Sequence, residues 1–205
     1  MPTYVVIGLG LLGAYIVGSI DFAVIVARMH GVDIHKEGSG NPGVSNVLRT
    51  VGRGPAAVVF VGDTLKGTIG AAMGWFAAFY AFEAVEVSGP WVWAAGFFAV
   101  LGHCYPIFHK FKGGKGVATG AGVLLFTASL VAIIVITIWG ILVWITRTAS
   151  IASMIIVVIT VPMLIWQDVP PESLLWAAAI ILLVIWRHKG NIGRMIKGTE
   201  EKVST

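Results

Sequence analysis

Long apolar runs recur from one end of the chain to the other, and they constrain its fold more than any other feature. Crossing the hydrocarbon core of a bilayer takes about 20 predominantly apolar residues in a helix. Charged residues make up 12% of the 205 residues, whereas soluble domains carry about 25%. We therefore expect an all-α integral membrane protein, and soluble enzymes, disulfide scaffolds and disordered chains are disfavoured. The runs cover residues 4–27, 55–82, 91–108, 117–146, 149–166 and 174–186.

The charges between these runs predict how the chain is oriented. Lysines and arginines collect in 28–54, 109–116 and 187–202, with Arg147 alone, whereas the other connections are acidic. Cytoplasmic loops of membrane proteins are enriched in Lys and Arg. The basic segments are therefore assigned to the cytoplasm, which places the N-terminus outside and the C-terminus in the cytoplasm. Topology accounts for the net charge of +4, so no nucleic acid partner is expected.

The apolar stretch at 117–146 decides the number of crossings. A single crossing there would leave Arg147 and the basic C-terminal segment outside. A hairpin with its turn near 127–129 returns both to the cytoplasm, so we predict seven transmembrane helices in a single domain, 1–205. Each limb of about 14 residues would reach about 21 Å, which is short for a core of about 30 Å.

The first polar segment on the predicted cytoplasmic side, residues 37–49, combines glycines with neutral donors and an arginine. Glycines let backbone N–H groups approach an anion closely. A helix that starts near Pro42 would direct its positive N-terminal end at the same place. A flexible capped loop is the alternative, but the added arginine favours anion binding. The candidates are Ser39, Asn41, Ser45, Asn46 and Arg49.

The second polar segment, residues 102–119, crowds lysines and glycines together. This composition is also typical of phosphate binding. It is not a Walker A loop, because Gly116 follows Lys115 where that motif requires Ser or Thr, so ATP hydrolysis is poorly supported. An ordinary lysine cluster of a cytoplasmic loop is the alternative. The candidates are Lys110, Lys112, Gly113, Gly114 and Lys115.

The third polar segment, residues 187–200, contains His188, Asn191 and Arg194 at intervals of three. On a helix these side chains would share one face. His188 could act as a base or as a proton donor to a phosphate. The alternative is an interfacial basic helix that contacts lipid phosphates. Ser150 follows Arg147 closely and could cap a helix or donate to a ligand.

Three ionisable residues lie inside the apolar runs. Asp63 and Lys66 are i,i+3 neighbours, so a neutralising pair is the plain interpretation and a brace for a functional pocket is the other. Asp21 has no obvious partner. The only cysteine, Cys104, excludes an internal disulfide, and a role as nucleophile is disfavoured because it sits in an apolar run. No carboxylate or histidine cluster has metal-ligand spacing, so no metal or cofactor is expected.

Glycine-rich loops, basic residues and a histidine at one boundary suit an enzyme that joins a soluble phosphorylated substrate to an oily one. A transporter of a phosphorylated solute is the rival hypothesis. A transporter needs polar groups along several spans, and here they gather on one face.

The three polar segments together resemble one known family. The strings are GSGNPGVSNVLR at 38–49, GHCYP at 102–106, KFKGGKGVAT at 110–119, RHKGNIGR at 187–194 and GTE at 198–200. They resemble the bacterial PlsY family of acyl-phosphate:glycerol-3-phosphate acyltransferases, and the resemblance covers nearly the whole chain. It implies seven helices in the bacterial inner membrane, with the active site facing the cytoplasm.

The reaction that the resemblance implies is the first acylation step of phospholipid biosynthesis. A long-chain acyl phosphate would donate its acyl group to the 1-hydroxyl of sn-glycerol 3-phosphate, giving lysophosphatidic acid and phosphate. Neither acyl-CoA nor acyl carrier protein would be used, and no cofactor is implied. In agreement, no histidine is followed five positions later by Asp, so the His-x4-Asp pair of other glycerol-phosphate acyltransferases is absent from the sequence.

Carried onto this sequence, the resemblance implies catalytic roles for His188, Asn191, Lys115 and Ser150, although Ser153 also matches the family's serine after an arginine. The substrate-binding set that it implies is Ser39, Asn41, Ser45, Asn46, Arg49, Lys110, Lys112, Gly113, Gly114 and Arg194. Two departures are mild: Val44-Ser45 replaces Ala-Thr, and Asp21 stands where many members have proline. Asp21 is thereby left without an implied role.

Overall fold

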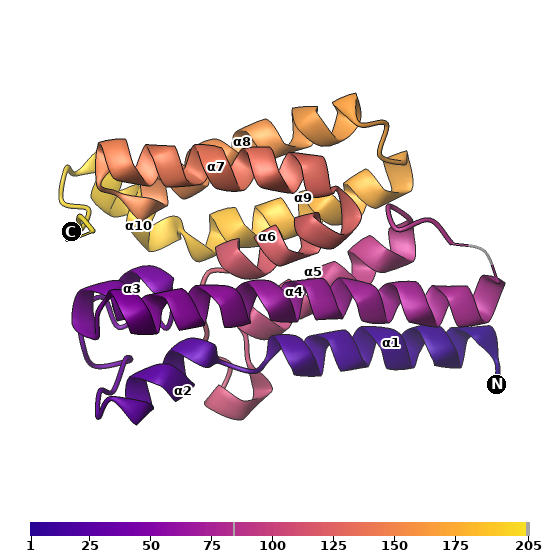
Figure 1. Cartoon of the computed structure of the whole chain (residues 1–205), viewed down its shortest axis with the longest axis horizontal. Coiled ribbons are helices and arrows are strands. Elements are labelled where there is room, and N and C mark those ends of the chain that lie inside the picture. Colours follow the sequence, from indigo (N-terminus) through magenta and orange to yellow (C-terminus); the bar gives the residue numbers. More distant parts are fainter. Residues whose placement is uncertain (84, 204–205) are drawn as a thin grey trace.

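The computed structural model describes residues 1–83 and 85–203, and these residues form α-helices and one short 3-10 turn without any strand. Figure 1 shows the long helices running along one common axis, with the N-terminus and the C-terminus at opposite ends. An odd number of crossings requires that arrangement. The elements are α1 (Thr3–Gly18), α2 (Phe22–Met29), α3 (Val44–Thr50), α4 (Arg53–Phe82), α5 (Pro90–Cys104), η1 (Ile107–His109), α6 (Val117–Thr127), α7 (Ser129–Thr146), α8 (Ala149–Trp166), α9 (Pro171–Arg187) and α10 (Lys189–Ile196).

The membrane character of the chain is confirmed by the length and composition of these helices. Within the described residues, α9 and α10 meet at a bend of 55° and together count as a sixth possible span. The apolar helix α6 is shorter, with 11 residues. Seven crossings and the orientation of the termini stay predictions. The five segments that could cross singly are Thr3–Met29, Arg53–Phe82, Pro90–His109, Ser129–Thr146 and Ala149–Trp166.

The turn predicted near 127–129 is found at Ala128, where α6 ends and α7 begins. The two limbs pack against each other, but they are unequal, with 11 and 18 residues. The expectation of two limbs of about equal length was wrong. The first limb is short because the backbone from Lys110 to Gly116 is still a loop, so α6 starts only at Val117.

The first apolar run is broken between α1 and α2, and the three intramembrane charges explain the break. Asp21 is the N-cap of α2, where its carboxylate accepts a hydrogen bond of 3.0 Å from the Val24 N–H. Lys66 Nζ donates to the free carbonyl of Ile20 over 2.6 Å and lies 2.7 Å from Asp63 Oδ1. The Asp63–Lys66 pair therefore neutralises itself and also satisfies the backbone of the broken span, as buried polar groups require.

Close helix contacts at glycine hold α4 against α6. A Cβ at Gly67 would collide with the backbone carbonyl of Thr119, and a Cβ at Gly122 would collide with that of Thr64. Thr68 Oγ1 adds a hydrogen bond of 2.9 Å to the Gly122 carbonyl. Small residues that let backbones approach are typical of helix packing in membranes. This contact fixes the start of α6, and with it the loop that carries Lys115.

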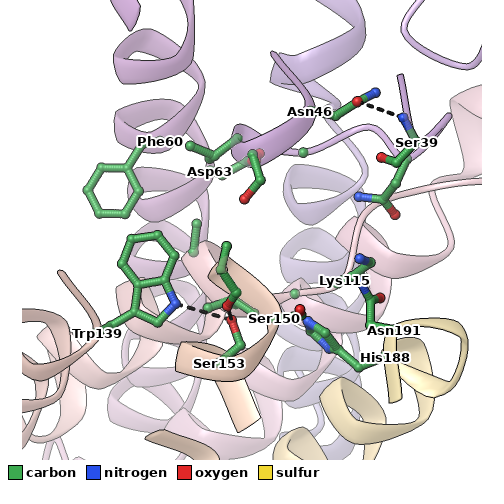
Figure 2. Close-up of a pocket in the computed structure, with 18 of the residues that line it drawn as sticks. Ser39, Asn46, Phe60, Asp63, Lys115, Trp139, Ser150, Ser153, His188 and Asn191 are labelled. Atoms are coloured by element: carbon green, nitrogen blue, oxygen red, sulfur yellow. Dashed lines mark hydrogen bonds between the residues drawn. The ribbon is translucent and has the colours of Figure 1, made fainter. Parts of the chain in front are cut away.

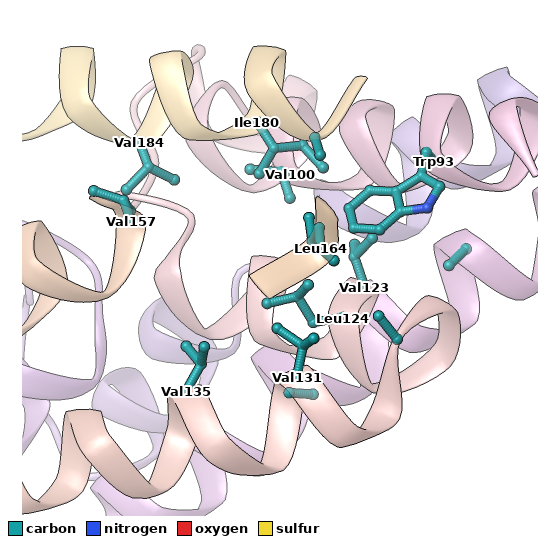
Figure 3. Close-up of a cluster of buried hydrophobic side chains, with 14 of the residues drawn as sticks. Trp93, Val100, Val123, Leu124, Val131, Val135, Val157, Leu164, Ile180 and Val184 are labelled. Atoms are coloured by element: carbon teal, nitrogen blue, oxygen red, sulfur yellow. The ribbon is translucent and has the colours of Figure 1, made fainter. Parts of the chain in front are cut away.

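The main apolar core lies between α5, α6, α7, α8 and α9 (Figure 3). Trp93 and Leu164 are almost completely buried in it, at 2% and 0% exposure. Large apolar side chains also cover the outward faces: Val158 is 70% exposed and Leu182 66%. Exposed apolar faces of this kind are expected where helices contact lipid.

Candidate active site

A cavity opens where α3, α8 and α10 meet the loop before α6. The structure brings together ten of the predicted site residues around it, although the sequence places them in four separate segments. Figure 2 shows Lys115, His188 and Asn191 grouped at one side, with Ser150 next to them and Ser39 and Asn46 across the cavity. The ten are Ser39, Asn41, Ser45, Asn46, Arg49, Lys115, Ser150, His188, Asn191 and Arg194.

The loop before α3 is held in shape by Asn46. Its side-chain oxygen accepts a hydrogen bond of 2.9 Å from the Ser39 N–H. Its amide nitrogen donates to the carbonyls of Ile34 and Glu37, over 3.2 and 3.0 Å. Asn46 is 2% exposed, so these bonds use most of its capacity. Its observed role is to fix the loop that presents Ser39, and a phosphate contact by Asn46 itself stays a prediction.

Glu200 ties the C-terminal segment to the cavity wall. Its carboxylate accepts hydrogen bonds from Ser150 Oγ at 2.7 Å, from Arg194 Nε at 2.8 Å and from the Asn191 amide. Partial burial works against the charged form, but these three donors outweigh it and hold the pKa of Glu200 below its usual value. Ser150 and Asn191 are thereby oriented by one carboxylate.

The ring of His188 has a defined tautomer. Its Nδ1 lies 2.8 Å from the Val184 carbonyl. A carbonyl oxygen only accepts, so Nδ1 carries the proton and Nε2 keeps a free lone pair. The side chain is buried but lines the cavity. This is the geometry that a general base requires.

Lys115 stands in the loop between η1 and α6 and is half-buried. Burial lowers its pKa to about 8; the negative charge of Glu200 opposes this shift, and the positive charges of Arg194 and Arg49 add to it. No carboxylate lies within ion-pair distance of Lys115 among residues 1–83 and 85–203. A cation in that condition is available to an anionic ligand.

Gly113 and Gly114 of the second polar segment fasten this loop and do not line the cavity. Arg187 donates to the carbonyls of Gly113 at 2.6 Å and Gly114 at 3.0 Å. A Cβ at Gly114 would collide with the His103 ring and approach the Pro42 carbonyl at 2.6 Å. Only glycine fits at position 114, where the loop before α6 packs against the loop before α3.

Lys110 and Lys112 lie outside the cavity and are exposed to solvent. The η1 turn and the left-handed backbone at Lys110 (φ 53°) carry this part of the loop away from the cavity. The structure therefore does not bring these two lysines together with the other predicted binding residues.

Several cavity residues were not foreseen from the sequence. Glu201 pairs with Arg49, and the His103 ring lies beside Asp63, with Nδ1 3.6 Å from Oδ1. Phe60 and Trp139 form an apolar wall (Figure 2). Two of these residues had a sequence signal: His103 lies inside the GHCYP string, and Glu201 directly follows the GTE string, whereas the wall residues lie in no motif.

The donor set fits an anion better than a metal. No group of three or more His, Cys, Asp or Glu side chains that could hold a metal is found among the described residues. Basic side chains and neutral donors converge instead on one cavity that also has an apolar wall. Fold and site thus define a membrane-embedded protein whose cavity combines basic side chains and neutral donors with an apolar wall.

Comparison with known proteins identifies the family. The sequence matches the family described as Glycerol-3-phosphate acyltransferase over residues 8–198. Glycerol-3-phosphate acyltransferases of Pseudomonas fluorescens and Rubrobacter xylanophilus are each 38% identical, over 91% and 94% of this chain and 94% and 92% of those relatives. The chain belongs to this family, the integral membrane glycerol-3-phosphate acyltransferases of phospholipid synthesis.

Solved structures agree with this assignment. The crystal structure of PlsY in its glycerol 3-phosphate form is 36% identical, with a TM-score of 0.87 over 97% of this chain and 96% of that chain. The lysophosphatidic acid form of PlsY gives 36% and 0.84, over 96% and 94%.

Proposed function

We propose that this protein transfers the acyl group of a long-chain acyl phosphate directly to the 1-hydroxyl of sn-glycerol 3-phosphate. The oxygen of that hydroxyl forms an ester bond with the acyl carbon, and the bond between the acyl carbon and the phosphate oxygen breaks. The products are 1-acylglycerol 3-phosphate and inorganic phosphate. One observation carries this proposal: basic side chains, neutral donors and an apolar wall line the same cavity.

Direct transfer is supported by the surroundings of two candidate nucleophiles, Cys104 and Ser150. Cys104, the only cysteine, is fully buried and does not line the cavity. Ser150 is hydrogen-bonded to a carboxylate and has no histidine partner among its described contacts. An acyl phosphate is already activated, so a covalent acyl-enzyme is not needed.

The phosphates are bound by Arg49, Lys115 and Arg194, together with the hydrogen-bond donors of Ser39 and Asn41. These groups align two phosphorylated molecules, which supplies proximity. They also stabilise the negative charge that develops on the acyl oxygen and on the departing phosphate. The same basic and hydrogen-bonding groups would stabilise the transition state of a thioester substrate less, because its leaving group is a thiolate.

The hydroxyl proton has two possible acceptors. His188 Nε2 has a free lone pair in the cavity, and an oxygen of a substrate phosphate could serve instead. The lipid substrate requires a membrane site, and the basic loops favour a cytoplasmic one. We assign the protein to the bacterial inner membrane on that basis, with the cavity open to the cytoplasm.

The donor is tested with purified protein in a lipidic medium, using radiolabelled glycerol 3-phosphate. Palmitoyl phosphate, palmitoyl-CoA and palmitoyl-acyl carrier protein are compared, with Arg49→Ala as the site variant. Arg53→Ala is the matched control, because Arg53 is exposed and outside the cavity. We expect lysophosphatidic acid from palmitoyl phosphate alone, lost in Arg49→Ala and kept in Arg53→Ala. Product from a thioester donor only would contradict the proposal.

A further inference from the structure

A second cavity continues from the candidate active site into the bundle. It is lined almost entirely by apolar side chains and glycine. Its one lining hydroxyl, Thr160, donates to the Ile156 carbonyl at 2.7 Å, and among the described residues the indole N–H of Trp93 has no hydrogen-bond partner. The two cavities share lining residues, so they meet at a common boundary: Gly116, Val117, Ala121, Val135 and Ile156.

The second cavity runs parallel to α8. Ile156, Thr160 and Leu164 line it at intervals of four, so one face of α8 follows it inward. On α9, Val184 lies at the same end as the active site and Ala177 lies deeper. The cavity therefore leads from the polar groups towards the opposite side of the membrane region.

Leu164 and Trp93 close the deep end. Both line the second cavity, both belong to the main buried cluster, and they are 0% and 2% exposed (Figure 3). Trp93 comes from the first turn of α5, and Leu164 from the last turn of α8. Two large buried side chains from different helices thus line this end, and close-packed interiors yield little to a longer chain.

The depth of the second cavity limits the length of an alkyl chain that it can hold. Along α8, Ser150 in the active site and Leu164 at the floor are separated by about 21 Å at 1.5 Å per residue. An extended alkyl chain advances about 1.25 Å per bond, from a C–C length of about 1.5 Å and tetrahedral angles. The distance therefore accommodates about 16 or 17 carbons.

We propose that this second cavity holds the acyl chain of the donor and that Leu164 and Trp93 at its floor determine the acyl-chain length. This inference rests on the proposed function and deepens it. Chains that end at the floor bury all their methylenes, whereas longer ones must bend or leave their carboxyl end misplaced at the reacting groups. Chain length is thus selected by the position of the acyl carbon as well as by burial.

The test is a competition between acyl phosphates in one reaction of the purified full-length protein. The donors are tetradecanoyl, hexadecanoyl, octadecanoyl and eicosanoyl phosphate, at saturating glycerol 3-phosphate. The ratio of products gives the ratio of kcat/KM values, and this ratio does not depend on how much of a variant is folded. The variants are Leu164→Ala, which deepens the floor, and Leu164→Phe, which raises it. Ile165→Ala is the control, because Ile165 is next on the same helix and 55% exposed.

We expect the wild-type protein and Ile165→Ala to prefer hexadecanoyl phosphate. Leu164→Ala should raise the octadecanoyl-to-tetradecanoyl ratio by about tenfold or more, and Leu164→Phe should lower it by a similar factor. Identical ratios in all four proteins would overturn the inference.

A failure of the proposed function is recognised separately, as absence of turnover with every acyl phosphate in the wild-type protein. In that case the second cavity is tested through the binding of lysophosphatidic acids with the same acyl chains, measured by calorimetry. Leu164→Ala must then bind the octadecanoyl compound relatively more tightly than the wild-type protein does, and an unchanged ratio would again overturn the inference.

Discussion

Arg49 and Glu201 form an ion pair in which Arg49 Nη2 lies 3.0 Å from Glu201 Oε2. Arg49 belongs to the first polar segment, and Glu201 to the C-terminal segment that Glu200 anchors. The two side chains are 19% and 45% exposed, so the pair sits at the rim of the cavity. Exposed ion pairs contribute about 1 kcal/mol or less. A substrate phosphate that binds Arg49 can therefore displace this carboxylate.

Glu201→Gln should lower the KM for glycerol 3-phosphate. The carboxylate competes with the phosphate for Arg49, and removing a competitor worth about 1 kcal/mol or less strengthens binding by up to about fivefold. We expect little change in kcat. Steady-state kinetics over a range of glycerol 3-phosphate concentrations measure both constants. Glu86→Gln, an exposed change between α4 and α5, is the control. A higher KM in Glu201→Gln would mean that Glu201 binds substrate.

Replacing His188 tests the proton acceptor. If Nε2 takes the hydroxyl proton, His188→Ala should lower kcat by about 10²–10⁴-fold. The loss should appear in kcat at saturating concentrations of both substrates. His30→Ala is the control, since His30 caps the C-terminal end of α2, is exposed and lies outside the cavity. Near-normal turnover in His188→Ala would remove His188 as the base and leave a substrate phosphate oxygen in that role.

The pKa of Lys115, lowered by burial to about 8, predicts a pH dependence of substrate binding. Below that pKa the amine is charged and attracts phosphate; as the pH rises through it, the charge is lost. The KM for glycerol 3-phosphate should therefore rise above about pH 8. Lys115→Arg should keep its charge throughout, because the pKa of arginine exceeds 12. The alkaline rise should be absent in that variant, and its persistence would assign the effect to another group.

Protonation of Glu200 should release the C-terminal segment. The pKa of this carboxyl is lowered in the folded protein, so its hydrogen bonds contribute stability above the ordinary pKa. That contribution is lost as the pH falls through the lowered value. Glu200→Ala should reproduce the loss at neutral pH. Limited proteolysis after Arg194 should be faster in Glu200→Ala than in the wild-type protein, and equal cleavage rates would contradict this role.

The helical architecture follows closely from the sequence because apolar length is a local property. The break at Ala128 was predicted from charge parity, and the Asp63–Lys66 pair from spacing alone. The role of Asp21 was missed, although N-caps have a clear sequence preference. A long apolar run hides a helix boundary, because in a membrane the broken backbone is satisfied by a distant group, here Lys66.

The candidate site was foreseen where motifs supplied the side chains and missed where tertiary packing did. Ten of the predicted residues line the cavity, whereas Lys110 and Lys112 are carried outward by the left-handed turn of their loop. The partner of Glu201 could not be predicted, because no local sequence pattern links a side-chain carboxylate near the C-terminus to Arg49. The apolar wall and the floor of the second cavity combine side chains of α4, α5, α7 and α8, so no single segment encodes them.

The most direct test of the central claim, direct acyl transfer from an acyl phosphate, is an isotope exchange. Purified protein is incubated with palmitoyl phosphate and radiolabelled inorganic phosphate, with and without glycerol 3-phosphate. Direct transfer predicts no label in palmitoyl phosphate when glycerol 3-phosphate is omitted, and equal amounts of lysophosphatidic acid and phosphate when it is present. Label entering palmitoyl phosphate without the acceptor would reveal an acyl-enzyme and contradict direct transfer.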